Sequence, residues 1–369
     1  MHDYLNHLEG QEKVSNILKE LYKNKRIPHA FLFTGIKGCG KFNTAINFLK
    51  LINSQNSETK LKKISQLQEP FVKIILPLPR GRGETNSDLP TEKLSDDQVK
   101  EIQSELQLKS ENPYHKITLE NANNIKINSI REISKIISLN FDEIKFRGII
   151  VDDAHKMTTE AQNSFLKNLE EPPEGIIYFL LTDQPKKLLR TIASRCWRIS
   201  FSPLDNSTLK NILLKNYGYN ADEIDAAIPF SNGSVTKASY LIKHNIKSLL
   251  EHTIIILRYS LAGKYLTATK VFNEIVNNTN NQDESLEIIS ELITYWFNDT
   301  LKNKYHTKKI NFFLYEDTIE KFNKKFCDVD ITKITKNLVE LRNSIKNNIN
   351  LNLLILNIIF ELSTIRNMK

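Results

Sequence analysis

The sequence predicts an α/β fold with a parallel sheet, followed by an all-helical C-terminal part. Three apolar runs support this prediction. Ala30–Thr34 leads into a glycine-rich turn and then a helical pattern, Ile149–Val151 ends in two carboxylates, and Ile176–Leu181 ends at Thr182. Short apolar runs that alternate with helical patterns are typical of buried parallel strands. Because ligands bind at the C-terminal edge of such sheets, we expect the functional groups at these strand ends.

The chain has 369 residues, which indicates two or three domains, and 40% of them are hydrophobic. The formal net charge of +8 suggests an anionic partner such as nucleic acid, but a composition rich in Lys, Asn and Ile is the preferred explanation. The three cysteines lie far apart, so neither zinc nor a disulfide framework is indicated. Neither a signal core nor an apolar run of the ~18 residues that a membrane span needs is present, and we expect a cytoplasmic protein.

The glycine-rich turn GIKGCGK runs from Gly35 to Lys41 between a predicted strand and a predicted helix. This is the context of a phosphate-binding loop. Gly35, Gly38 and Gly40 allow backbone N–H groups to converge on phosphate oxygens, and Lys41 adds a full positive charge. The loop is compatible with ATP, and a glycine-rich turn that binds nothing stays the alternative.

Phe42 follows the lysine where a phosphate-binding loop has Ser or Thr, whose hydroxyl binds Mg²⁺. A Mg²⁺ site and metal-assisted hydrolysis are therefore not expected, and no metal ligand is assigned. Asp152 stands where P-loop ATPases hold Mg²⁺, and Asp153 stands where an acid orients the attacking water. The alternative is that both carboxylates only cap the next helix.

An insertion of about 54–120 separates the loop helix from the acidic strand. We predict a strand at Phe71–Leu76, an exposed loop from Glu84 to Asp97 and, beyond the insertion, an amphipathic helix at Ile125–Leu139. The Arg80–Gly83 segment, RGRG, is interpreted as a solvated loop in preference to a nucleic-acid contact.

With both strands placed, the sequence resembles the clamp-loader branch of the AAA+ ATPases, and within it the delta-prime family of bacterial DNA polymerase III subunits. The matching elements are Gly10-Gln11, Arg26 to Ala30, Gly35 to Lys41, Asp152 to His155, Leu169 to Pro173 (LEEPP), and Thr191 to Cys196. They cover roughly residues 8–50 and 145–200. The absence of cysteine between 40 and 195 departs from the relatives that carry a zinc module.

The resemblance implies roles for three further residues. Thr182 would be the sensor-1 residue, which senses the γ-phosphate, and Lys237 would be the sensor-2 residue, which touches the nucleotide phosphates. Arg195 would be an arginine finger that reaches ATP held by a neighbouring subunit. A solvated lysine and a surface salt bridge are the alternatives for Lys237 and Arg195.

The resemblance also implies three domains: an AAA+ P-loop domain at 1–202, a helical lid at 203–245 and an all-α collar at 246–369. The expected partners are other clamp-loader subunits in a hetero-pentamer-like ring, the sliding clamp and primed DNA, with no membrane. The expected function is that of a clamp-loader subunit of DNA polymerase III without ATPase activity of its own. A self-sufficient AAA+ ATPase and a DNA-binding scaffold with a vestigial nucleotide fold stay open.

Overall fold

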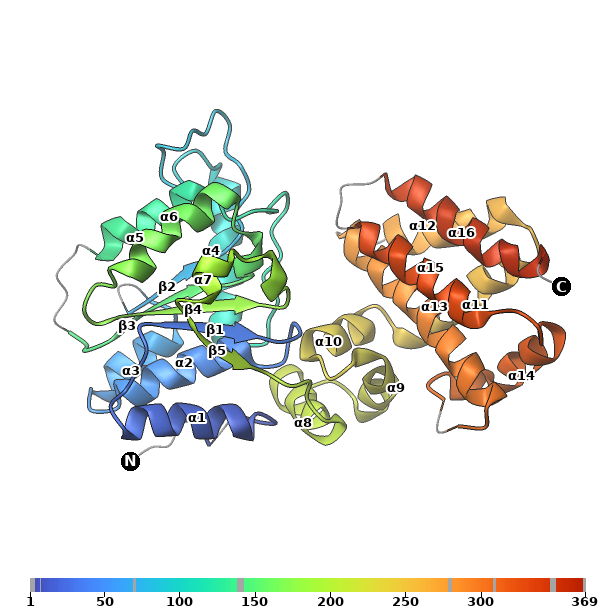
Figure 1. Cartoon of the computed structure of the whole chain (residues 1–369), viewed down its shortest axis with the longest axis horizontal. Helices are drawn as coiled ribbons and strands as arrows, with labels where there is room; N and C mark the ends of the chain where they lie inside the picture. The colour runs from blue at the N-terminus through green and yellow to red at the C-terminus, as the bar shows by residue number, and fades with distance from the viewer. Residues whose placement is uncertain are drawn as a thin grey trace. The chain divides into compact units, whose positions relative to one another are not determined.

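The computed structural model describes residues 4–6, 8–68, 71–137, 143–277, 281–307, 310–345 and 350–367 (Figure 1). The chain forms two compact units. The first comprises Met1–Asn220 and Asn232–Ser239, and the second comprises Ala221–Ser231 and Tyr240–Lys369. The domain boundaries expected after residues 202 and 245 stay predictions.

The first unit contains a five-stranded parallel sheet in the order β2-β3-β4-β1-β5. Its strands are β1 (Ala30–Thr34), β2 (Val72–Ile75), β3 (Arg147–Val151), β4 (Ile176–Thr182) and β5 (Trp197–Ser200). The three apolar runs therefore form the three central strands, which confirms the predicted α/β class. The predicted strand within the insertion is β2, and it pairs with β3.

Helices cover both faces of this sheet (Figure 1). One face packs against α1 (Glu12–Lys23), α2 (Lys41–Ile52) and α3 (Glu58–Ser65), and the other packs against α5 (Ile127–Ile137) and α6 (Thr159–Glu170). The last two residues of the helix predicted at 125–139 lie outside the described residues. Alternate residues of β1 point to opposite faces, so Phe31 stacks on Phe179 with ring centroids 5.4 Å apart while Leu32 joins the other core.

The remaining helices of the first unit connect and flank the sheet. They are α4 (Asp96–Glu111), α7 (Arg190–Ala193), α8 (Asn206–Tyr217) and the start of α10 (Val235–Lys243), with the short 3₁₀ turns η1 (Ala154–Lys156) and η2 (Pro185–Lys187). A capping box between Ser95 and Gln98 sets the first turn of α4.

The second unit consists of helices. They are α9 (Ala221–Ser231), α11 (Ile246–Leu261), α12 (Tyr265–Asn277), α13 (Gln282–Lys304), η3 (Phe313–Tyr315), α14 (Glu316–Lys325), α15 (Ile331–Ser344) and α16 (Leu351–Asn367). Trp296 and Phe297 of α13 are buried in its core. Within the described ranges, no helix has the length and apolar character that crossing a bilayer requires.

Glu84 corrects the prediction that an exposed loop begins at this residue. Its side chain is only 3% exposed, and its carboxylate accepts bonds from Lys126 Nζ at 2.6 and 2.7 Å, from Asn128 at 2.8 Å and from the Gly81 N–H at 2.8 Å. Burial by itself would raise the pKa of Glu84, but Lys126 and these donors hold it below its ordinary value. The carboxylate therefore ties the RGRG segment to the residues that begin α5.

Replacing Glu84 by glutamine is expected to lower the free energy of unfolding by about 2 kcal/mol at neutral pH, because Lys126 loses its counter-charge. The folded-state pKa is depressed, so the stabilisation is complete above the ordinary value of 4.5 and is lost as the pH falls through the folded-state pKa. Urea titrations at several pH values should show the difference from wild type shrinking below that pH. The exposed Glu92→Gln change serves as the control, and an equal loss in both variants would contradict the assignment.

Candidate functional site

The glycine-rich loop connects β1 to α2 and contains two glycines in the left-handed region. The φ angle is 70° at Gly38 and 98° at Gly40, a conformation that side chains disfavour. A Cβ on Gly38 would lie 2.6 Å from the Thr236 backbone nitrogen, and one on Gly40 would lie 3.6 Å from the Tyr114 hydroxyl. Gly38 O also accepts a bond from Val235 N at 3.2 Å. The loop is thus held against the start of α10, as well as against Tyr114.

The Lys41 ammonium lies within the loop. Its Nζ donates to Gly35 O at 2.7 Å and to Ile36 O at 2.6 Å, and the residue is 9% exposed. Gly35 N in turn donates to Thr182 O at 3.2 Å, so the end of β4 is joined to the beginning of the loop. The predicted glycines, Lys41 and Thr182 therefore meet at one edge of the sheet.

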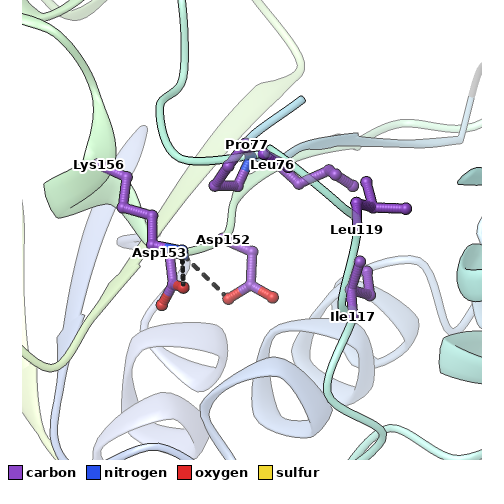
Figure 2. A pocket seen from close by; sticks show the side chains of 8 residues that line it. Leu76, Pro77, Ile117, Leu119, Asp152, Asp153 and Lys156 are labelled. Atoms are coloured by element: carbon purple, nitrogen blue, oxygen red, sulfur yellow. Dashed lines mark hydrogen bonds and ion pairs between the residues drawn. The ribbon is translucent and has the colours of Figure 1, made fainter. Parts of the chain in front are cut away.

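Asp152 and Asp153 follow β3 at the same edge (Figure 2). Asp153 has a φ of 51°, which Asp tolerates better than most residues, and its carboxylate pairs with Lys37 at 3.3 Å and Lys156 at 3.4 Å. Burial raises the pKa of Asp152. Burial would also raise the pKa of Asp153. The positive charges of Lys37 and Lys156 outweigh this effect and keep the pKa of Asp153 below its ordinary value. The pKa values of the two neighbouring acids are therefore shifted in opposite directions.

The pocket in Figure 2 adjoins these acids. Its volume is about 50 Å³, and Leu76, Ile117 and Leu119 form its apolar wall beside Asp152 and Asp153. A cavity needs only about 10–15 Å³ of such volume to hold one water molecule, so this pocket has room for a few waters and is well below the roughly 300–1,000 Å³ of ligand pockets. Any nucleotide would have to contact the glycine-rich loop itself.

His155 and Asp183 join the strand-end groups, although neither was a predicted site residue. His155 Nδ1 lies 3.1 Å from the Thr182 hydroxyl and 3.4 Å from an Asp183 oxygen, and Gln184 N donates to that hydroxyl at 3.0 Å. In the described parts of the chain, Asp153, His155 and Asp183 bring possible metal-ligand atoms within 4.8 Å of one another. Within this cluster, Lys37 and Lys156 compensate the negative charge of Asp153.

Lys237 lies in the first turn of α10, close in sequence to the residues that contact the loop. The residue is half-buried, and its backbone N–H donates to Ser234 Oγ at 3.1 Å, an N-terminal cap. Because Thr236 contacts Gly38, Lys237 is one residue away from the loop contact. The predicted sensor-2 position is therefore near the glycine-rich loop.

Phe42, Lys109 and Tyr114 determine whether a divalent metal fits here. Phe42 is 5% exposed and carries no oxygen, and the Lys109 ammonium lies 4.5 Å from the centroid of its ring. Burial raises the pKa of Tyr114 to about 12, so its phenol stays neutral at physiological pH. The residues next to Lys41 thus offer an aromatic ring and a cation where Mg²⁺ requires oxygen ligands, and they do not fit the metal.

Arg195 lies at the other edge of the sheet. It follows α7 and precedes β5, whereas the loop follows the C-terminal end of the parallel neighbour β1. Its guanidinium is exposed, pairs with Glu170 at 2.9 Å and donates to Thr191 O at 3.1 Å. The fold brings the other predicted site residues together but keeps Arg195 apart from them.

Sequence reasoning assigned no role to His155, Asp183, Lys109 or Glu170. The sequence offers a signal for Glu170 and His155, since they belong to the LEEPP and DDAH motifs, and Asp183 directly follows Thr182. Lys109 carries no such signal, because its approach to Phe42 depends on how the insertion folds back on the sheet.

The parallel sheet with a glycine-rich loop after β1 and strand-end acids after β3 defines a P-loop protein of the AAA+ type. The sequence pattern of the family described as DNA polymerase III, delta subunit matches residues 10–205. This range is more than half of the 369-residue chain, and the chain belongs to that family.

Individual relatives resemble part of the chain. The DNA polymerase III subunit tau of Bacillus subtilis (strain 168) is 27% identical over 200 residues, which is 54% of this chain and 29% of that protein. The gamma subunit of Buchnera aphidicola subsp. Schizaphis graminum (strain Sg) is 27% identical over 242 residues, or 64% and 56% of the two chains. The chain thus spans less than two thirds of the length of either relative.

Among solved structures, a DNA polymerase III gamma subunit-related protein from Thermotoga maritima aligns with a TM-score of 0.44 and 16% identity. The alignment covers 95% of this chain and 99% of that one.

Proposed function

We propose that this chain is a clamp-loader subunit of the delta-prime type. In this role it joins other DNA polymerase III subunits in a ring that places the sliding clamp on primed DNA in the cytoplasm. Its contribution to ATP hydrolysis is Arg195, which it offers to the ATP site of a neighbouring subunit. The match to the DNA polymerase III delta-subunit family supports this proposal.

The position of Arg195 is the observation that carries the proposal. Ser200 lies five positions after Arg195 and pairs with Thr34, immediately before the glycine-rich loop. At about 3.3 Å per residue, β5 from Trp197 to Ser200 alone spans roughly 10 Å, so Arg195 lies beyond the end of the strand that is remote from the loop. An exposed arginine at this edge is suited to a nucleotide held by another chain.

The chemistry of Arg195 fits that task. A guanidinium is permanently charged, and its planar donors match phosphate oxygens. Its partner Glu170 is half exposed, and exposed ion pairs contribute only about 0.2–1 kcal/mol. The pair can therefore hold the side chain at the surface and release it to a phosphate at little cost.

Reconstitution tests the proposal directly. The other clamp-loader subunits of the same organism would be assembled with and without this chain, and ATP-dependent loading of the clamp onto primed DNA would be measured. Loading should require this chain, and an equal rate in its absence would refute the proposal. Arg195 variants then test the finger separately.

The isolated chain is expected to show no Mg²⁺-dependent ATP hydrolysis above background. Phe42→Ser alone should leave this unchanged, because the Lys109 ammonium still lies beside the position that a metal would take. A phosphate-release assay on the purified chain measures both results. Mg²⁺-dependent turnover by the wild-type chain above background would instead favour a self-sufficient ATPase.

A further inference from the structure

Lys109 lies on α4, a helix of the insertion, and its ammonium reaches Phe42, the residue that follows the glycine-rich loop. Lys109 is 6% exposed, and its Nζ donates to His115 O at 2.7 Å while lying over the Phe42 ring. His115 is held in turn, because its Nε2 lies 3.0 Å from a Glu105 oxygen on the same helix. The Lys109 ammonium is therefore held by the His115 carbonyl and the Phe42 ring.

A buried ammonium requires negative charge nearby, and Asp152 supplies it. Burial lowers the pKa of Lys109, while Asp152 and then Asp153 oppose that change. Burial raises the pKa of Asp152, and among the charges that oppose this, Lys109 acts most strongly. The contacts that place the ammonium are the bond to His115 O and the Phe42 ring, and Asp152 is the carboxylate whose charge favours it most.

We propose that the Lys109 ammonium takes the place of the divalent cation at this P-loop. Phe42 replaces the oxygen ligand, and its ring faces the ammonium. The site carries a built-in monovalent cation and excludes Mg²⁺ by charge and by space. Phosphate groups that reach the loop meet Lys41 and Lys109 without a metal. This inference does not depend on Arg195, so either proposal can fail alone.

Mn²⁺ is the probe for the test, because its electron paramagnetic resonance signal separates bound from unbound ion. The full-length wild type, Phe42→Ser and the double variant F42S/K109A would be titrated with Mn²⁺ in the presence of a non-hydrolysable ATP analogue. The serine restores an oxygen ligand, and the alanine removes the competing cation. The double variant should bind Mn²⁺ at least about tenfold more tightly than Phe42→Ser alone.

A matched control replaces another lysine of the same helix. Lys100 lies on the exposed side of α4, with a side chain 77% exposed, so F42S/K100A should bind Mn²⁺ no better than Phe42→Ser. Equal Mn²⁺ affinity of Phe42→Ser and F42S/K109A, whether both bind or neither does, would overturn the proposal.

A second measurement covers the case in which F42S/K109A does not fold. Lys109→Met keeps the aliphatic contact with Phe42 and removes only the charge, so it should lower the melting temperature. Adding Asp152→Asn should restore part of that loss, because the carboxylate then needs no counter-charge. Strictly additive shifts of the two changes would show that the groups do not act as a pair and would also overturn the proposal.

Discussion

Replacement of Arg195 by alanine is expected to reduce ATP hydrolysis and clamp loading by the reconstituted complex by about 10³-fold or more, the effect of removing an arginine finger. Lysine at this position should restore little, because a single ammonium does not reproduce the planar donors of the guanidinium. The complex should still assemble, since Arg195 is exposed and its pair with Glu170 contributes little stability. Phosphate release and gel filtration measure the two outcomes.

Arg198 provides the matched control for this experiment. It lies three residues further along, in β5, and is also exposed. Arg198→Ala should leave hydrolysis close to the wild-type rate. If both alanine variants lose activity equally, general surface charge accounts for the effect and the finger assignment is wrong.

Replacement of Asp299 by alanine is expected to destabilise the helical second unit by about 3 kcal/mol. This carboxylate of α13 is fully buried and accepts bonds from Asn311 N at 2.6 Å, Phe312 N at 2.9 Å and Lys302 Nζ at 2.7 Å. Phe312 packs edge-on against Phe230 at 5.2 Å, so the carboxylate holds an aromatic core residue in place. Its removal leaves the buried N–H of Phe312, the partly buried N–H of Asn311 and an ammonium without their acceptor.

The two tryptophans of the chain make this stability prediction measurable. Trp296 is buried on the same helix as Asp299, so its fluorescence reports unfolding of the second unit once Trp197 is replaced by phenylalanine. In a urea titration, Asp299→Asn should lose less than Asp299→Ala because it retains an oxygen. The exposed Asp317→Ala should lose less than about 1 kcal/mol. A loss that small for Asp299→Ala would contradict the structural role given to this carboxylate.

The sequence allowed the sheet and its functional edge to be predicted because both depend on local patterns. Apolar runs such as Ile176–Leu181 form strands wherever they can be buried, and the Gly35–Lys41 spacing encodes the conformation of a loop. Parallel strands necessarily gather their C-terminal ends at one edge. Asp152 and Thr182 could thus be placed near the loop before any contact was known.

Contacts made by charged side chains of the insertion could not be predicted in the same way. Glu84 stands in a polar stretch typical of an exposed loop, yet its carboxylate is buried with Lys126. Nothing in the residues around Lys109 marks it as a partner of Phe42. Each contact joins segments tens of residues apart, so it depends on how the chain folds back.

The sequence by itself determined the fold class, the glycine-rich loop and the loss of the metal ligand at Phe42. The tertiary structure decided which charges meet: Lys109 lies on Phe42, while Arg195 is at the opposite edge of the sheet from the loop. The physical reason is that secondary structure follows from the periodicity of neighbouring residues. The surroundings of a buried charge instead depend on packing between distant segments, because a carboxylate or ammonium is stable inside a protein only where another segment supplies its partner.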